Sequence, residues 1–119
     1  MKETNEQQLS YYCVIPAPVM TDGRLSSDEK ILYGSISGMS KEKGYCWASN
    51  DRLASYFKDK DGKPKTKRTV INWLNHLEEL GYIKRTIVFS DENTNQIEQR
   101  RIYLTGKIAP KIEGEEYEK

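Results

Sequence analysis

The clearest pattern of apolar and polar positions lies between residues 66 and 82, which read TKRTVINWLNHLEELGY. Its apolar residues recur at steps of three and four, so they fall on one face of a helix. They are Val70, Trp73, Leu74, Leu77 and Leu80. Thr66 is a suitable N-cap, because its hydroxyl can accept a hydrogen bond from a backbone N–H two or three residues on. Gly81 stands where a left-handed residue closes a helix. The pattern therefore predicts an amphipathic helix over residues 66–80.

The opposite face of this helix has an unusual order of charge. It carries Lys67, Arg68, Ile71, Asn72 and Asn75 near its start, then Glu78 and Glu79 near its end. The helix macrodipole favours the reverse order, with acids in the first turn and bases in the last, although each mismatch costs only roughly a few tenths of a kcal/mol. Two interpretations stay open. Either these side chains are simply solvated, or the helix binds a partner that carries negative charge.

Two shorter helices are predicted ahead of this one. Ser26, followed three residues later by Glu29, forms a capping box at the start of the first. Its apolar face consists of Ile31, Leu32, Ile36 and Met39. Ser49 or Asn50 caps the second helix. The residues that face inward from it are Leu53, Ala54 and Phe57.

The N-terminal part has strand character. Residues 11–15 (YYCVI) are aromatic and β-branched, but Pro16 and Pro18 exclude a central place in a sheet. This piece is therefore an edge strand or an extended segment laid on the core. Residues 45–47 (YCW) leave room for one small strand.

A β-hairpin is predicted after the long helix. Residues 82–89 and 97–104 are β-prone, and the turn-forming residues 90–96 (SDENTNQ, numbered from Ser90) separate them. Residues 1–10 are polar, and residues 106–119 are acidic at their end and poor in large apolar side chains. We therefore expect a flexible N-terminus (1–10), one domain (11–105) and a flexible tail or linker (106–119).

A basic run joins the second predicted helix to the third. Residues 58–68 (KDKDGKPKTKR) contain six basic and two acidic side chains, and Gly62 and Pro64 make most of the run a loop. Such a run is usually a solvated loop. Beside a helix N-terminus it is also a natural place for phosphate contacts.

Composition excludes several classes of protein. The net charge is only +1, so any attraction to nucleic acid must be local. Cys13, Cys46 and His76 are the only residues of their types, and they make neither a zinc set nor a disulfide framework. No apolar run is long enough to span a bilayer, and a reducing cytoplasm fits best. Without a catalytic signature we expect no enzyme, cofactor or metal.

Three helices followed by a hairpin, with an extra N-terminal strand, is the element order of an α+β winged helix-turn-helix. In that fold the last helix enters the DNA major groove, where Arg, Lys and Asn read base edges. The predicted DNA-binding residues are Lys63, Lys65, Thr66, Lys67, Arg68, Thr69, Ile71, Asn72, Asn75, Lys84, Arg85, Arg100 and Arg101. Arg68 is the candidate for a bidentate guanine contact and Asn72 for adenine, while Asn75 reaches the DNA backbone. The acidic Asp91 and Glu92 at the hairpin tip oppose phosphate contacts there.

Four segments also carry a family resemblance. They read YYCVIPAPVM, LSSDEKILYGSI, GYCWASNDRLASYF and KRTVINWLNHLEELGYIKR. Over about residues 11–104 they resemble the helix-turn-helix domains of bacteriophage and plasmid replication proteins from low-GC Gram-positive bacteria. The resemblance implies binding to double-stranded DNA at an origin, in a bacterial or phage-infected cell. In that family a separate C-terminal domain often engages replication machinery. The chain is expected to be either a small protein by itself or the N-terminal part of a longer one.

One departure from the family pattern concerns the turn before the third helix. The family usually has a tight glycine-containing turn there, whereas residues 58–65 intervene in this chain. The insertion either changes the angle between the helices or adds phosphate contacts of its own. Two other functions stay open: a transcriptional regulator that binds an operator, and a protein-interaction module without DNA binding. The sequence leaves the oligomeric state open.

Overall fold

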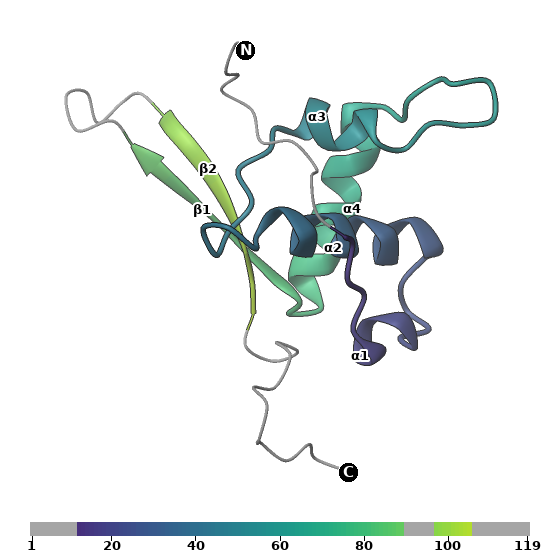
Figure 1. Ribbon diagram of the computed structural model, residues 1–119, viewed down its shortest axis with the longest axis horizontal. Helices are drawn as coiled ribbons and strands as arrows, with labels where there is room; N and C mark the ends of the chain where they lie inside the picture. The colour runs from purple at the N-terminus through teal and green to yellow at the C-terminus, as the bar shows by residue number, and fades with distance from the viewer. Residues whose placement is uncertain (1–11, 90–96, 106–119) are drawn as a thin grey trace.

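The computed structural model describes residues 12–89 and 97–105, and it contains four helices and one antiparallel sheet (Figure 1). The elements are α1 (Ala17–Met20), α2 (Ser27–Met39), α3 (Asn50–Ser55), α4 (Lys67–Glu79), β1 (Ile83–Phe89) and β2 (Ile97–Leu104). Helix α4 contacts α2, α3 and β1, and in Figure 1 α2 crosses it while α3 lies at its N-terminal end. This is an α+β fold with the arrangement of a winged helix-turn-helix. The expected flexible ends and the turn at 90–96 lie outside the described residues.

Side-chain caps begin the three longer helices, as predicted. The Ser26 hydroxyl accepts from the Glu29 N–H at 3.2 Å, and the Glu29 carboxylate accepts from the Ser26 N–H at 2.7 Å, which completes the capping box of α2. Ser49 caps α3 and Thr66 caps α4 in the same way. Gly81 has a φ of 87°, a left-handed conformation that glycine adopts without steric cost. Local sequence therefore sets where these helices begin and end.

The core lies where α2, α3 and α4 meet the sheet. Val70, Leu74 and Leu77 of α4 are fully buried, as their spacing predicted. Trp73 and Leu80 are only partly buried and pack against this core, and the Trp73 ring meets Phe57 edge-on at 5.1 Å between centroids. Ile31 was predicted to face the core, and this is wrong: 46% of its surface is exposed.

The predicted hairpin forms, and the structure gives its register. Ile83 pairs with Leu104 and Ile87 with Arg100, and a register shift follows at Val88/Phe89. The small strand expected at 45–47 is a single bridge, in which Cys46 and Ile102 exchange both backbone hydrogen bonds, at 2.9 and 2.8 Å. This bridge attaches the segment between α2 and α3 to β2.

The extra N-terminal strand is wrong. Residues 12–16 pair with no strand in the described part of the chain, and the one-turn helix α1 follows them. They form the other predicted alternative, an extended segment laid on the core. A Cβ at Gly34 of α2 would lie 2.8 Å from Ile15 Cγ1 and 3.3 Å from Cys13 Cβ, so the segment lies directly against a helix surface that lacks a side chain. Contact with the helix takes the place of strand pairing.

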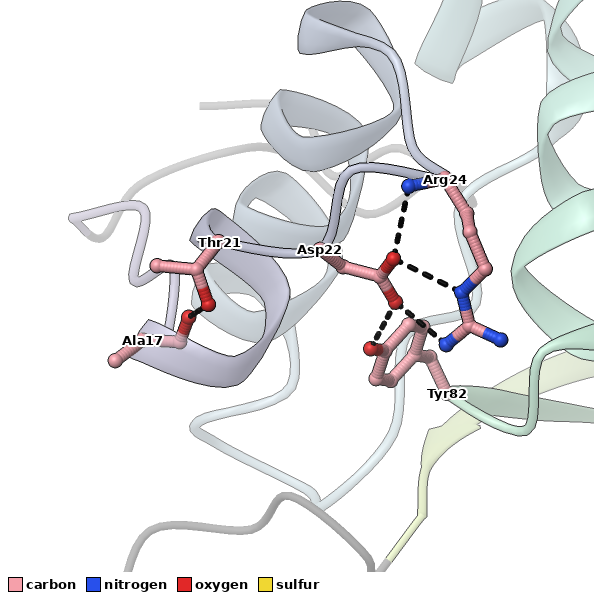
Figure 2. Close-up of polar contacts among 5 residues, drawn as sticks. All are labelled: Ala17, Thr21, Asp22, Arg24 and Tyr82. Carbon is pink, nitrogen blue, oxygen red and sulfur yellow. Dashed lines mark hydrogen bonds and ion pairs between the residues drawn. The ribbon is translucent and has the colours of Figure 1, made fainter.

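A carboxylate joins the loop before α2 to the end of α4 (Figure 2). Asp22 accepts hydrogen bonds from the Arg24 side chain at 2.9 and 2.7 Å, from the Arg24 backbone N–H at 2.9 Å, and from the Tyr82 hydroxyl at 2.5 Å. The Arg24 guanidinium and the Tyr82 hydroxyl hold the pKa of the Asp22 carboxyl well below its usual range. Burial, reinforced by the Asp22 charge, raises the pKa of the Tyr82 hydroxyl.

The ionised form of Asp22 therefore stabilises the fold. Because its pKa is lower in the folded state, this stabilisation is present above the ordinary aspartate pKa of about 4 and is lost as the pH falls below it. We expect Asp22→Asn to be less stable than the wild type by the same amount at pH 7 and 5, and the difference to begin to shrink between pH 4 and 3. Urea unfolding at pH 7, 5, 4 and 3 measures this. A difference that is independent of pH would show that the carboxylate charge is irrelevant.

Candidate nucleic-acid interface

The exposed face at the start of α4 carries the predicted base-reading side chains. Lys67, Arg68 and Asn72 are exposed, and none of their side chains has a hydrogen bond or ion pair with another described residue. Arg68 and Asn72 are four positions apart, so they share one face of the helix. Thr66 and Thr69 are engaged with each other: the Thr66 hydroxyl accepts from the Thr69 N–H at 3.2 Å, and the two hydroxyls are 2.9 Å apart. Ile71 is half-buried.

The second half of α4 is attached to the hairpin. Arg85 of β1 donates from Nε to Glu78 Oε1 at 2.6 Å and from Nη2 to Asn75 Oδ1 at 2.7 Å. Asn75 remains exposed, but its carbonyl oxygen already has this partner. These contacts pair the acidic end of α4 with a cation, which the helix macrodipole also favours at a C-terminus.

Two arginines of β2 make intramolecular contacts. Arg100 donates to Asn50 Oδ1 at 2.6 Å and to the Ala48 carbonyl at 2.5 Å, and its burial lowers the pKa of the guanidinium. Arg101 donates to Gln99 at 2.6 Å, and its guanidinium lies 4.4 Å from the centre of the Tyr45 ring. Lys84, in contrast, is exposed, and its side chain has no hydrogen bond or ion pair to any residue that the structure describes.

Trp47 belongs to an aromatic cluster that reaches β2. Its ring lies 5.8 Å from that of Tyr45, and the Tyr45 ring lies 5.5 Å from that of Tyr103 on β2. The Lys43 amine covers Trp47 at 4.8 Å. This half-buried cluster fastens the bridge at Cys46 to the sheet, where burial raises the pKa of the Cys46 thiol to about 11.

The segment between α3 and α4 is ordered. We call residues 57–66 the basic arm. Phe57, at its base, is buried, and its carbonyl accepts from the Lys65 N–H at 3.0 Å. Lys58 and Pro64 form a β-bridge, so the two sides of the arm run antiparallel. The arm replaces the tight turn of the resembling family with a small hairpin, and its predicted contact residues Lys63 and Lys65 are exposed.

Sequence reasoning missed the residues that shape this arm. Asp59 accepts from the backbone N–H groups of Asp61 and Lys63 at 2.8 and 2.9 Å. Gly62 has a φ of 82°. An aspartate that opens a short turn and a glycine three residues later is a recognised signal for a three-residue hairpin loop. An ordered hairpin loop could therefore have been predicted from the residues Asp59-Lys60-Asp61-Gly62.

Other kinds of site find no support in the residues that can be described. Across 12–89 and 97–105, no three His, Cys, Asp or Glu side chains gather so that they could hold a metal ion. Among the same residues, none of the helices combines the length and apolar character needed to cross a membrane.

Comparison with known proteins gives a family match. A family model described as a helix-turn-helix domain matches residues 23–83, just over half of the chain. A search of curated proteins and a search of solved structures each returned no match. The matched region spans α2, α3, the basic arm and α4, which is where the exposed Arg68 and Asn72 lie. The chain therefore belongs to this family of helix-turn-helix domains, and its β1–β2 hairpin takes the position of a wing.

Proposed function

We propose that this protein binds double-stranded DNA with the N-terminal half of α4 in the major groove. The observation that carries the proposal is the pair Arg68 and Asn72, exposed on one face of the second helix of a helix-turn-helix and without described partners. Helix-turn-helix domains present the N-terminal residues of this helix to base edges. The family match supports this orientation.

The side chains divide into four roles in this proposal. Arg68 contacts guanine through a bidentate pair of hydrogen bonds, and Asn72 contacts adenine in the same way. Phosphate contacts, which fix the position of the helix but do not read sequence, come from Thr66, Lys67, Thr69 and Lys84. Ile71 is half-buried beside them and offers apolar contact. Four other predicted residues, Asn75, Arg85, Arg100 and Arg101, support the site, because intramolecular partners hold their side chains.

The DNA site we propose is a replication origin of a phage or plasmid. The support is the resemblance of residues 11–104 to replication proteins of Gram-positive bacteria. An operator, bound by a transcriptional regulator, is the second candidate for the same surface. Selection of bound sequences from a random duplex library, followed by their location in the source replicon, distinguishes the two.

A protein-interaction module is the candidate that lacks DNA binding. Ile87 and Phe89 of β1 favour it, since 50% and 48% of their surfaces are exposed. The net charge of +1 is also small for a nucleic-acid-binding domain. A titration of labelled duplex at low salt distinguishes the functions, because only a DNA-binding protein raises its fluorescence anisotropy.

The test of the recognition helix is Arg68→Ala. We expect its affinity for the selected site to fall about 10- to 100-fold, because a bidentate arginine–guanine contact is worth about 1–3 kcal/mol. Its affinity for a random duplex should fall much less. Fluorescence anisotropy with both duplexes measures the ratio. The matched control is Lys41→Ala, which removes an exposed cation just beyond the C-terminal end of α2. An equal loss on both duplexes would mean that Arg68 contacts only phosphate.

A further inference from the structure

The backbone of the basic arm is closed by its own hydrogen bonds. The Asp59 N–H donates to the Lys63 carbonyl at 3.0 Å, and the Gly62 N–H donates to the Asp59 carbonyl at 2.9 Å. At the base, the Lys65 N–H donates to the Phe57 carbonyl at 3.0 Å. The ladder continues from the tip to a buried aromatic residue, so the arm is built on the core.

Asp59 determines the shape of the tip. One oxygen of its carboxylate, Oδ1, accepts from both the Asp61 and the Lys63 N–H groups. These are backbone donors that an exposed loop would otherwise leave to water. A side chain that accepts two such bonds restricts the tip to one conformation. Asp59 is the one arm carboxylate used in this way, since Asp61 makes no side-chain hydrogen bond to a described residue.

The arm carries four lysines and two aspartates. Lys58, Lys60, Lys63 and Lys65 are all exposed, and none has an ion pair within the described part of the chain. The Asp59 carboxylate accepts hydrogen bonds from backbone N–H groups. Asp61 is therefore the one carboxylate of the arm that is exposed and has no side-chain hydrogen bond to a described residue. Unpaired lysines on an ordered scaffold suit a polyanion whose charges repeat at regular intervals, as DNA phosphates do.

The arm is placed where such a polyanion would lie. In Figure 1 it leaves the N-terminal end of α4 and extends away from the helix, on the side opposite to the β1–β2 hairpin. The start of α4 therefore has an element on each side of it. DNA that receives this end of α4 in its major groove continues past both elements.

From these observations we infer that the basic arm is a second wing, which contacts the DNA backbone beside the recognition helix, with Asp59 as its positioning residue. The inference rests on the proposed DNA binding and adds an element to it. Holding the lysines in place beforehand avoids part of the entropy cost of ordering a loop on binding. The arm binds phosphates, so it strengthens binding to every sequence alike.

The decisive experiment compares two aspartates of the same arm. Asp59→Ala and Asp61→Ala remove the same charge, and simple electrostatics predicts that both bind DNA more tightly. If Asp59 positions the arm, Asp59→Ala should instead lower the affinity for a random duplex about three- to tenfold, whereas Asp61→Ala should leave it equal or slightly higher. Asp59→Asn keeps the Oδ1 acceptor without the charge, so it should behave like Asp61→Ala. Anisotropy titrations of these variants of the full chain, after a check that their melting temperatures are unchanged, measure the effect.

The salt dependence of binding provides the second readout. Lys60→Ala/Lys63→Ala should reduce the slope of log Kd against log salt by about 2, and it should weaken binding to selected and random duplexes equally. An unchanged slope, or an Asp59→Ala variant that binds as tightly as Asp61→Ala, would overturn the second wing. If the arm variants fail in this way while Arg68→Ala still loses specificity, only the second wing is wrong. If they bind weakly and Arg68→Ala is normal, the arm stands and the recognition helix is wrong.

Discussion

Leu74→Ala is expected to lower the free energy of unfolding by about 3–5 kcal/mol. Leu74 is fully buried on α4, the helix that contacts α2, α3 and β1. Truncation to alanine removes buried methyl groups and leaves a cavity that the surrounding helices fill only in part. A loss of this size is a large share of the roughly 5–15 kcal/mol that stabilises a typical domain. Urea unfolding followed by circular dichroism measures it.

The control for Leu74 is Ile31→Ala on α2. Both are apolar residues at positions where helical periodicity predicts burial, but 46% of the Ile31 surface is exposed. We expect its replacement to change the stability by about 0.5 kcal/mol or less, as for other exposed positions. Similar losses for the two variants would mean that a partner or a second copy covers Ile31 in solution.

The second large effect is expected for Glu29→Ala. Glu29 is buried, and its two carboxylate oxygens have different partners: Oε1 accepts from the Ser26 N–H, and Oε2 lies 2.7 Å from His76 Nδ1 on α4. Alanine removes half of a capping box and a hydrogen bond to a charged group. Together these contribute about 2–3 kcal/mol. For a domain of this size we expect the melting temperature to fall by roughly 10–15 °C.

A double-mutant cycle separates the two contributions of Glu29. His76→Ala should be less costly than Glu29→Ala, because it leaves the capping box intact. The double variant should be about 1 kcal/mol more stable than the sum of the single losses predicts, since each single variant breaks the same contact. Glu79→Ala, an exposed carboxylate on α4, serves as the charge control. Additive losses would show that Glu29 acts through its cap alone and that α2 and α4 are not coupled there.

Helix α4 illustrates what local patterns can predict. Its N-cap Thr66, its row of buried apolar residues and the left-handed Gly81 were each predicted from neighbouring residues, at most four positions apart. No knowledge of the fold was needed. The same applies to the capping box at Ser26 and to the β-hairpin. The basic arm had a local signal as well, in Asp59 and Gly62. That signal lies in the turn-forming residues and not in the charges, and it predicts an ordered hairpin.

The candidate site could be predicted only in part from the sequence. Lys, Arg and Asn were assigned to DNA by their type, and type does not reveal whether a side chain is available. Arg85 is bound to Glu78 and Asn75, and Arg100 reaches Asn50, which lies 50 positions away in the chain. Among the residues predicted to contact DNA, the available cations are those on the arm, those at the start of α4, and Lys84 of β1. This distinction came from the packing of the hairpin against the helices.

By itself, the sequence determined α2, α3 and α4, their caps, the hairpin and the α+β class, because helical periodicity and capping depend on neighbouring residues; the one-turn helix α1 was not predicted. The tertiary structure decided three further points. It laid residues 12–16 on α2 at Gly34 instead of in a sheet, it exposed Ile31, and it paired the arginines of the hairpin with intramolecular partners. Each of these depends on contact between segments distant in the chain, and such contacts follow from packing and not from the order of residues in one segment.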